Sequence, residues 1–148
     1  ALLRLGLNKV TLKRDSASRG CCYYRSARAR RYWKSETAYR QRRHRDIMMM
    51  LSGDVAVEIK TAQPNNWGAE SDLRQARQVL HELHPSASKA EVDDLLDESA
   101  AGAWDLLCSP RVWHSVEAVA AELLERETLS AARVREILHA DATTTPHN

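Results

Sequence analysis

Apolar residues in the second half of the chain recur at helical intervals, and prolines interrupt the pattern. The first stripe consists of Leu73, Ala76, Leu80 and Leu83. Their 3-4-3 spacing places all four side chains on one face of a helix. Pro85 ends this helix because proline lacks the backbone N–H and clashes with the preceding turn. The pattern predicts a mainly α-helical fold class.

A capping box marks the start of the next helix. Ser88 is followed three residues later by Glu91, so each side chain can bond the other's backbone N–H. The predicted buried stripe of this helix consists of Val92, Leu95, Leu96, Ala103, Leu106 and Leu107. After Pro110, a further helix is predicted to bury Val112, Val116, Val119, Ala120, Leu123 and Leu124. We interpret residues 128–130 as a short bend before a last small helix, whose apolar residues are Val134, Ile137 and Leu138.

The first half of the chain has weaker periodicity and a small strand element near the N-terminus. Val10 and Leu12 alternate with polar residues, which predicts a short strand. Residues 15–20 are interpreted as a turn and residues 21–24 as a second strand. Ser35 is a suitable N-cap for a helix that continues through residues 47–51. Gly53 then indicates either close packing against a neighbour or a break between two helices.

The length and composition fit one globular domain, residues 1–148, with a frayed tail at residues 143–148. The chain is 43% hydrophobic and 28% charged, and it lacks the run of roughly 18 apolar residues that a membrane span needs. Its three cysteines do not form the pattern of a disulfide scaffold. We therefore expect a cytoplasmic protein, with membrane association only through a region outside this sequence.

Charge is distributed unevenly along the chain. Residues 1–60 contain 15 of the 22 Lys and Arg but only 5 of the 20 Asp and Glu. Within them, residues 25–45 combine nine Lys and Arg with Tyr32, Trp33 and Tyr39. Arginines and aromatic rings can bind phosphates and stack on bases. A solvated basic face is the commoner meaning of such a stretch, so nucleic acid is not the favoured partner.

Asp72 is the main candidate for chemistry. It lies at the predicted start of a helix, four residues before Ala76, so its carboxylate is expected to project toward the buried stripe. An acid at this position can simply complement the helix dipole. The functional alternative is a metal ligand held on a rigid element.

Several segments resemble the peptidase domain of FtsH-type ATP-dependent zinc metallopeptidases. Residues 68–76, Gly-Ala-Glu-Ser-Asp-Leu-Arg-Gln-Ala, are similar to the family's Gly-Ala-x-x-Asp-Leu-x-x-Ala. Residues 50–59 are similar to its Leu-Gly-Gly-Arg-Ala-Ala-Glu-Glu helix, although Ser52-Gly53-Asp54 replaces Gly-Gly-Arg. Residues 120–129 match Ala-x-x-Leu-Leu-Glu-x-Glu-Thr-Leu. The Asn8-Lys-Val-Thr strand fits the family's segment after the catalytic helix.

The resemblance implies zinc-dependent hydrolysis of peptide bonds, with Asp72 as one zinc ligand. In the family, a His-Glu-x-x-His helix supplies two further ligands and the Glu that activates water. That helix is absent from residues 1–148 and is expected just before Ala1. No catalytic residue of the family is therefore assigned in this chain, and we expect residues 1–148 to be inactive by themselves.

The resemblance also implies a set of partners. These are a protein or peptide substrate, an AAA+ ATPase domain or subunit, and further copies of the chain. No Gly-x-x-x-x-Gly-Lys-Ser/Thr phosphate loop occurs in the sequence, so nucleotide hydrolysis would need another domain. The alternative function is a non-catalytic binding module that contacts nucleic acid or a partner protein through the basic N-terminal third.

A substitute metal site within the chain is not expected. His81 and His84 are three residues apart, but they do not form His-Glu-x-x-His, and Pro85 follows at once. The other histidines, at positions 44, 114, 139 and 147, are scattered. One carboxylate without nitrogen or sulfur partners does not hold zinc.

Overall fold

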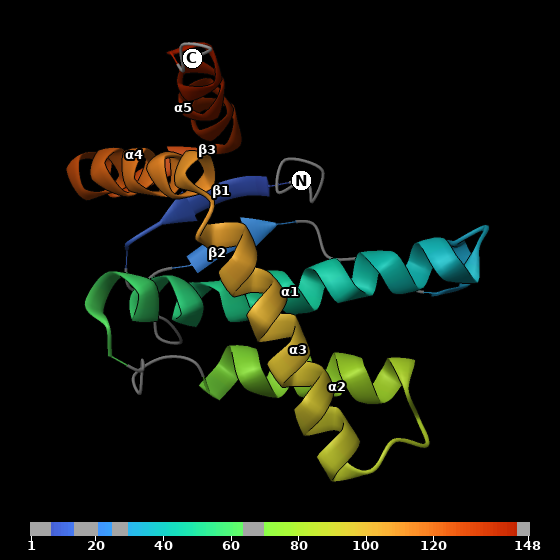
Figure 1. The fold of residues 1–148 in the computed structure, drawn as a ribbon. Coiled ribbons are helices and arrows are strands. Elements are labelled where there is room, and N and C mark those ends of the chain that lie inside the picture. The colour runs from blue at the N-terminus through green and yellow to red at the C-terminus, as the bar shows by residue number, and fades with distance from the viewer. Residues whose placement is uncertain (1–6, 14–20, 25–29, 64–69, 145–148) are drawn as a thin grey trace. The chain divides into compact units, whose positions relative to one another are not determined.

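A computed structural model describes residues 7–13, 21–24, 30–63 and 70–144. Within these ranges it contains five α-helices and a three-stranded antiparallel sheet (Figure 1), which confirms the mainly helical fold class. None of the described helices is both long enough and apolar enough to cross a bilayer. The chain divides into two compact units. Unit 1 comprises Ala1–Ser26 and Pro110–Asn148, and unit 2 comprises Ala27–Ser109.

Unit 2 begins with a short 3-10 helix, η2 (Arg30–Tyr32), and the long helix α1 (Glu36–Thr61). The predicted cap is confirmed, because Ala38 N donates to Ser35 Oγ at 3.3 Å. Both interpretations of Gly53 were wrong. Helix α1 is continuous through this position, and no described atom lies within 4 Å of a Cβ built on it.

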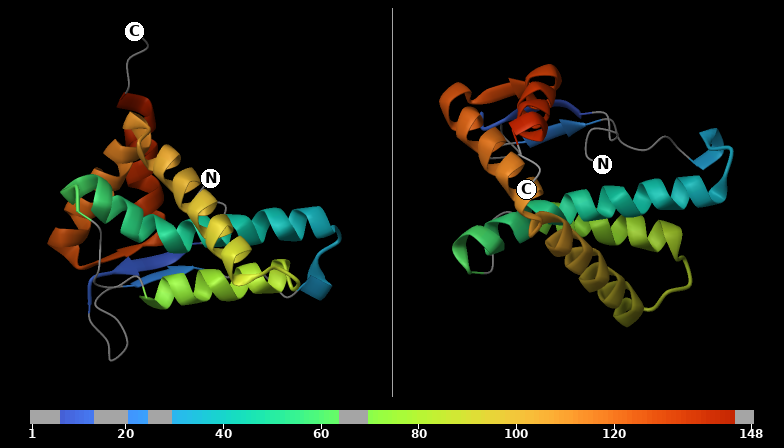
Figure 2. Two further views of the ribbon diagram at one scale, coloured as in Figure 1. Left: turned by 60° about the horizontal axis from the view of Figure 1, so that its bottom comes forward. Right: turned by 45° about the horizontal axis from the view of Figure 1, so that its top comes forward.

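Two further helices complete unit 2: α2 (Glu70–Leu83) and α3 (Lys89–Leu107). Helix α2 runs antiparallel to α1, and α3 packs across the pair (Figures 1 and 2). The capping box is confirmed, since Glu91 N donates to Ser88 Oγ at 3.3 Å and Ser88 N donates to Glu91 Oε2 at 2.7 Å. The buried core consists of Ile47, Leu51, Ala76, Val79, Leu80, Leu83, Val92 and Leu96. Leu106 was wrongly assigned to the buried stripe, because it is 41% exposed.

Unit 1 contains the sheet, with strands β1 (Leu7–Thr11), β2 (Cys21–Tyr24) and β3 (Thr128–Ser130). Both predicted N-terminal strands are confirmed, while the turn predicted for residues 15–20 lies outside the described residues. The strand order is β2-β1-β3. The bend predicted at residues 128–130 was wrong. These residues are extended and pair with β1, with Val10 opposite Leu129.

Helices α4 (Pro110–Arg126) and α5 (Ala131–Thr144) pack with this sheet in unit 1. The buried cluster consists of Leu123, Leu129, Val134 and Ile137. Ala120 and Leu124 were wrongly assigned to the buried face, because both are exposed, Leu124 to 74%. Helix α5 includes the first two residues of the predicted tail, and residues 145–148 lie outside the described part of the chain.

Candidate functional site

The antiparallel pairing of α1 and α2 brings two pairs of ionisable side chains together. The negative charge of Asp54, in the C-terminal half of α1, acts on Asp72 in the first turn of α2. His44, in the N-terminal half of α1, lies beside His84, which follows the last residue of α2. At a rise of about 1.5 Å per residue, the ten-residue step from His44 to Asp54 separates the pairs by about 15 Å along α1.

Asp72 differs from the sequence expectation in one respect. Its side chain is exposed and does not project into the buried stripe of α2. Its carboxyl group is nevertheless partly desolvated, and this partial burial raises the pKa of Asp72 above its ordinary value. The negative charge of Asp54 raises the pKa further. The electrostatic effect of Asp54 on Asp72 thus links α1 to the first turn of α2.

These two carboxylates are too few for a zinc centre. Zinc sites in proteins use three or four nitrogen, sulfur or oxygen ligands from side chains and water. Across residues 7–13, 21–24, 30–63 and 70–144, no group of three or more His, Cys, Asp and Glu side chains could hold a metal ion. The described residues therefore do not fit a complete zinc site, and Asp72 could contribute only one ligand of a larger set.

The basic part of α1 is neutralised largely by contacts within unit 2. Asp46 is buried, with only 1% of its side chain exposed, and lies between two arginines. Arg42 Nε donates to Asp46 Oδ1 at 2.9 Å, and Arg43 Nη1 lies 3.6 Å from Asp46 Oδ2. Arg43 Nη2 also donates to Glu82 Oε2 of α2 at 2.7 Å. Arg43 thus connects α1 to α2, Arg42 pairs within α1, and the two arginines do not form a free basic face.

The two imidazoles at the other end of the helix pair form the second cluster. Their ring centroids are 6.2 Å apart and the ring planes are inclined by 58°. His84 Nε2 is buried and has no hydrogen-bond partner among the described residues. Burial lowers the pKa of His44, and the neighbouring His84 and Arg40 lower it further. Glu98 of α3 opposes these effects.

In unit 1, two segments that carry the family resemblance pair with each other. Thr11, the last residue of β1, donates through its hydroxyl to the carbonyl of Glu127 at 3.1 Å. The hydroxyls of Thr11 and Thr128 are 2.7 Å apart. Glu127 has a φ of 57°, and its carbonyl also accepts a hydrogen bond from Leu12 N at 2.8 Å. Residues 120–129 thus link the end of α4 to the sheet.

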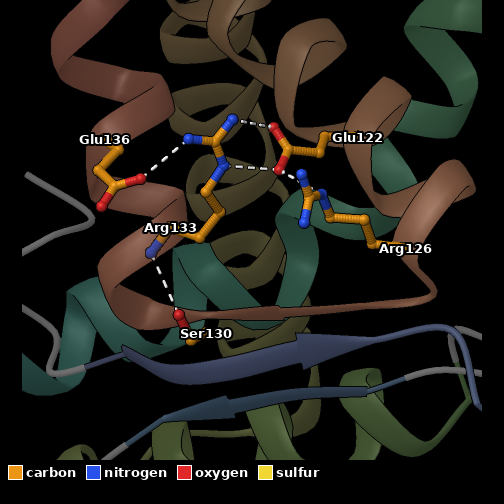
Figure 3. A network of polar contacts seen from close by, with 5 residues as sticks. All are labelled: Glu122, Arg126, Ser130, Arg133 and Glu136. Carbon is orange, nitrogen blue, oxygen red and sulfur yellow. Dashed lines mark hydrogen bonds and ion pairs between the residues drawn. The ribbon is translucent and has the colours of Figure 1, made fainter.

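A network of charged side chains connects α4 and α5 (Figure 3). Arg133 donates to both carboxylate oxygens of Glu122, at 2.6 and 2.7 Å, and to Glu136 at 2.9 Å. Arg126 also contacts Glu122, at 2.9 Å. Hydrogen bonds from Arg133 lower the pKa of Glu122, and the same bonds raise the pKa of Arg133. Because each carboxylate of the network contacts an arginine, we interpret the network as a structural contact that holds α4 against α5.

Sequence reasoning identified Asp72 but missed its neighbour Asp54 and the His44–His84 pair. Both pairs join residues that are far apart in the sequence, so no local spacing predicts them. The Arg42–Asp46 pair was accessible from the sequence, since residues four apart meet on a helix surface. The burial of this pair could not be predicted from the sequence, because it depends on the packing of α1 against its neighbours.

Comparison with known proteins adds no assignment to this geometry. No protein-family model matches the chain, and no curated protein sequence matches it significantly.

Proposed function

We propose that the chain is the helical part of a zinc-dependent peptidase domain of the FtsH type, in which Asp72 supplies one carboxylate ligand. The observation that carries this proposal is the position of Asp72 in the first turn of α2, where its carboxyl group is partly desolvated while later turns of the helix are buried in the core of unit 2. A carboxylate held in this way on a rigid helix can serve as a metal ligand.

The positions of the resembling segments give independent support. Residues 50–59 lie in α1 and residues 70–76 in α2, and Leu51 and Ala76 of these two segments belong to one buried core. Residues 8–11 lie in β1 and pair with residues 128–130, which include the end of the third segment. Thr11 and Thr128, whose hydroxyls are 2.7 Å apart, are separated by 117 positions in the sequence.

Helix α2 offers Asp72 a rigid support. Four residues on the later turns of α2 are buried in the core of unit 2: Ala76, Val79, Leu80 and Leu83. The first turn also carries Glu70, which is exposed, so Asp72 is distinguished from it by its approach to α1. In this proposal the chain orients one carboxylate, and zinc when bound would polarise the peptide carbonyl and activate water.

The remaining ligands must come from elsewhere, because the described residues do not form a complete zinc site. In the family, these ligands come from a His-Glu-x-x-His helix, which residues 1–148 do not contain. The resemblance also implies a protein or peptide substrate and an AAA+ ATPase partner. Asp54 stands where the family has arginine, and its extra negative charge distinguishes this chain from that pattern.

The alternative of a nucleic-acid-binding module receives less support. Sequence-independent binding depends on lysines and arginines that are free to neutralise phosphates. Arg40 pairs with Glu36, while Arg42 and Arg43 pair with Asp46 and Glu82. Much of the positive charge on α1 is therefore used within unit 2.

Hydrolysis of a labelled unfolded protein by the complete gene product tests the proposal. We expect activity that a zinc chelator removes and that added zinc restores. Asp72→Ala should abolish the activity, whereas Glu70→Ala, which removes an acid from the same turn, should retain it. Equal activity of the Asp72→Ala variant and the unmodified protein would refute the assigned role.

A further inference from the structure

The contact between His44 and His84 is independent of the proposed peptidase chemistry. The two rings lie about 15 Å along α1 from Asp54, at the opposite end of the helix pair. His44 belongs to α1 and His84 directly follows α2, and their ring centroids are 6.2 Å apart. Because the two rings are neighbours where the end of α2 meets α1, a change in charge on His44 acts directly on the packing at this point.

The surroundings of His44 favour its neutral form. Charged and titratable groups face His44 from each helix of unit 2: Arg40 from its own helix, His84 at the end of α2 and Glu98 from α3. Arg40 and a protonated His84 repel a positive charge on His44, and only Glu98 attracts it. Glu98 is exposed, so solvent screens its attraction.

His84 contributes a buried atom with no partner. Its Nε2 is inaccessible to solvent and makes no hydrogen bond with any described residue. A buried polar atom without a partner is costly, and this atom therefore offers no hydrogen bond that would compensate a positive charge on His44.

We propose that the contact of His44 with His84 is proton-sensitive: it stabilises the packing of α1 against the end of α2 when His44 is neutral and loosens this packing when His44 is protonated. Histidine is the side chain whose ordinary pKa allows such a change between pH 5 and 8.

The direction of the pH dependence follows from linkage. Burial and the neighbouring positive charges lower the pKa of His44 in the folded chain below its ordinary value of 6.5. The unfolded chain therefore binds more protons in the window below pH 6.5, so stability falls as the pH falls through that window. Each unit of difference between the unfolded and folded pKa lowers the folding equilibrium constant about tenfold.

Imidazole titrations followed by NMR test the proposal on the chain and its variants. His44 should titrate below pH 6.5. The substitution His84→Gln should raise the pKa of His44, because it removes the facing charge, and Glu98→Gln should lower it. His81→Gln is the matched control, since it removes an exposed histidine of α2, and it should leave the His44 titration unchanged.

Urea unfolding between pH 8 and pH 5 provides the second readout. The urea midpoint of the unmodified chain should fall with acidification below pH 6.5, and His44→Gln should reduce that fall, whereas His81→Gln should not. A His44 that titrates at or above pH 6.5, or a pH dependence that is the same with and without His44, would overturn the proposal. If His44→Gln fails to fold, the NMR titration of the His84→Gln variant is the test: a raised pKa of His44 would support the proposal, and an unchanged pKa would overturn it.

Discussion

The buried carboxylate of Asp46 leads to the sharpest prediction about stability. Its side chain is 1% exposed, and the side chains of its partners Arg42 and Arg43 are 13% and 14% exposed. The substitution Asp46→Ala would leave two guanidinium groups in a largely desolvated position without their shared anion. The matched control is Asp93→Ala, since the Arg77–Asp93 pair has the same chemistry with side chains 44% and 39% exposed.

The expected magnitudes differ because burial removes the screening by water. Breaking a buried ion pair by removing one partner costs about 3–5 kcal/mol. Arg43 keeps its contact with Glu82, so we expect a loss near the lower limit, about 3 kcal/mol. The exposed pair should contribute about 0–1 kcal/mol. Both substitutions replace Asp with Ala inside a helix, so the change in helix propensity is similar and largely cancels.

Urea unfolding at pH 7, followed by circular dichroism, measures the difference. Asp46→Ala should lower the free energy of unfolding by at least about 2 kcal/mol more than Asp93→Ala, which is a factor of roughly 30 in the equilibrium constant. The slopes of the transitions must agree for the comparison to hold. Losses that agree within about 1 kcal/mol would refute the reasoning that the basic segment of α1 is neutralised inside unit 2.

Other predictions follow from single positions. Gly53→Ala should raise the free energy of unfolding by about 0.5–1 kcal/mol in urea, because the site is open and lies inside α1; a decrease would mean that the position is constrained. Leu129→Ala should cost about 2–5 kcal/mol, because Leu129 is 1% exposed in the cluster of unit 1; a loss below about 1 kcal/mol would contradict the pairing of β3. Asp54→Asn should lower the pKa of Asp72 in a carboxyl NMR titration, because a neighbouring negative charge is removed. A raised carboxyl pKa means that the folded chain holds this proton more tightly. The Asp54→Asn variant should therefore lose less stability as the pH rises through the Asp72 titration. An unchanged Asp72 titration would show that the charge of Asp54 does not act on Asp72.

Local patterns predicted the helices because their signals are carried by neighbouring residues. The spacing of Leu73, Leu80 and Leu83, the proline at position 85 and the Ser88 capping box determine where α2 ends and α3 begins. The same reasoning failed for residues 128–130, because their extended conformation depends on pairing with β1, more than 110 residues away in sequence. A three-residue strand has too few side chains to show alternation.

Burial along α4 was predicted less well than its extent. Leu123 and Leu124 are adjacent and equally apolar, yet 9% of one and 74% of the other is exposed. Adjacent residues point about 100° apart on a helix, so two neighbouring leucines at the edge of an apolar face can differ in burial, and the packing of α4 in unit 1 decides which one is covered. In the candidate site, the helix-start position of Asp72 could be predicted, whereas its approach to Asp54 required the antiparallel packing of α1 and α2.

Zinc content is the most direct test of the proposed role of Asp72. The complete gene product should bind zinc, Asp72→Ala should lose most of it after dialysis against a weak chelator, and Glu70→Ala should keep it. Because both variants remove one acid from the first turn of α2, only a ligand role distinguishes them. Equal zinc stoichiometry and affinity in the two variants would contradict the account.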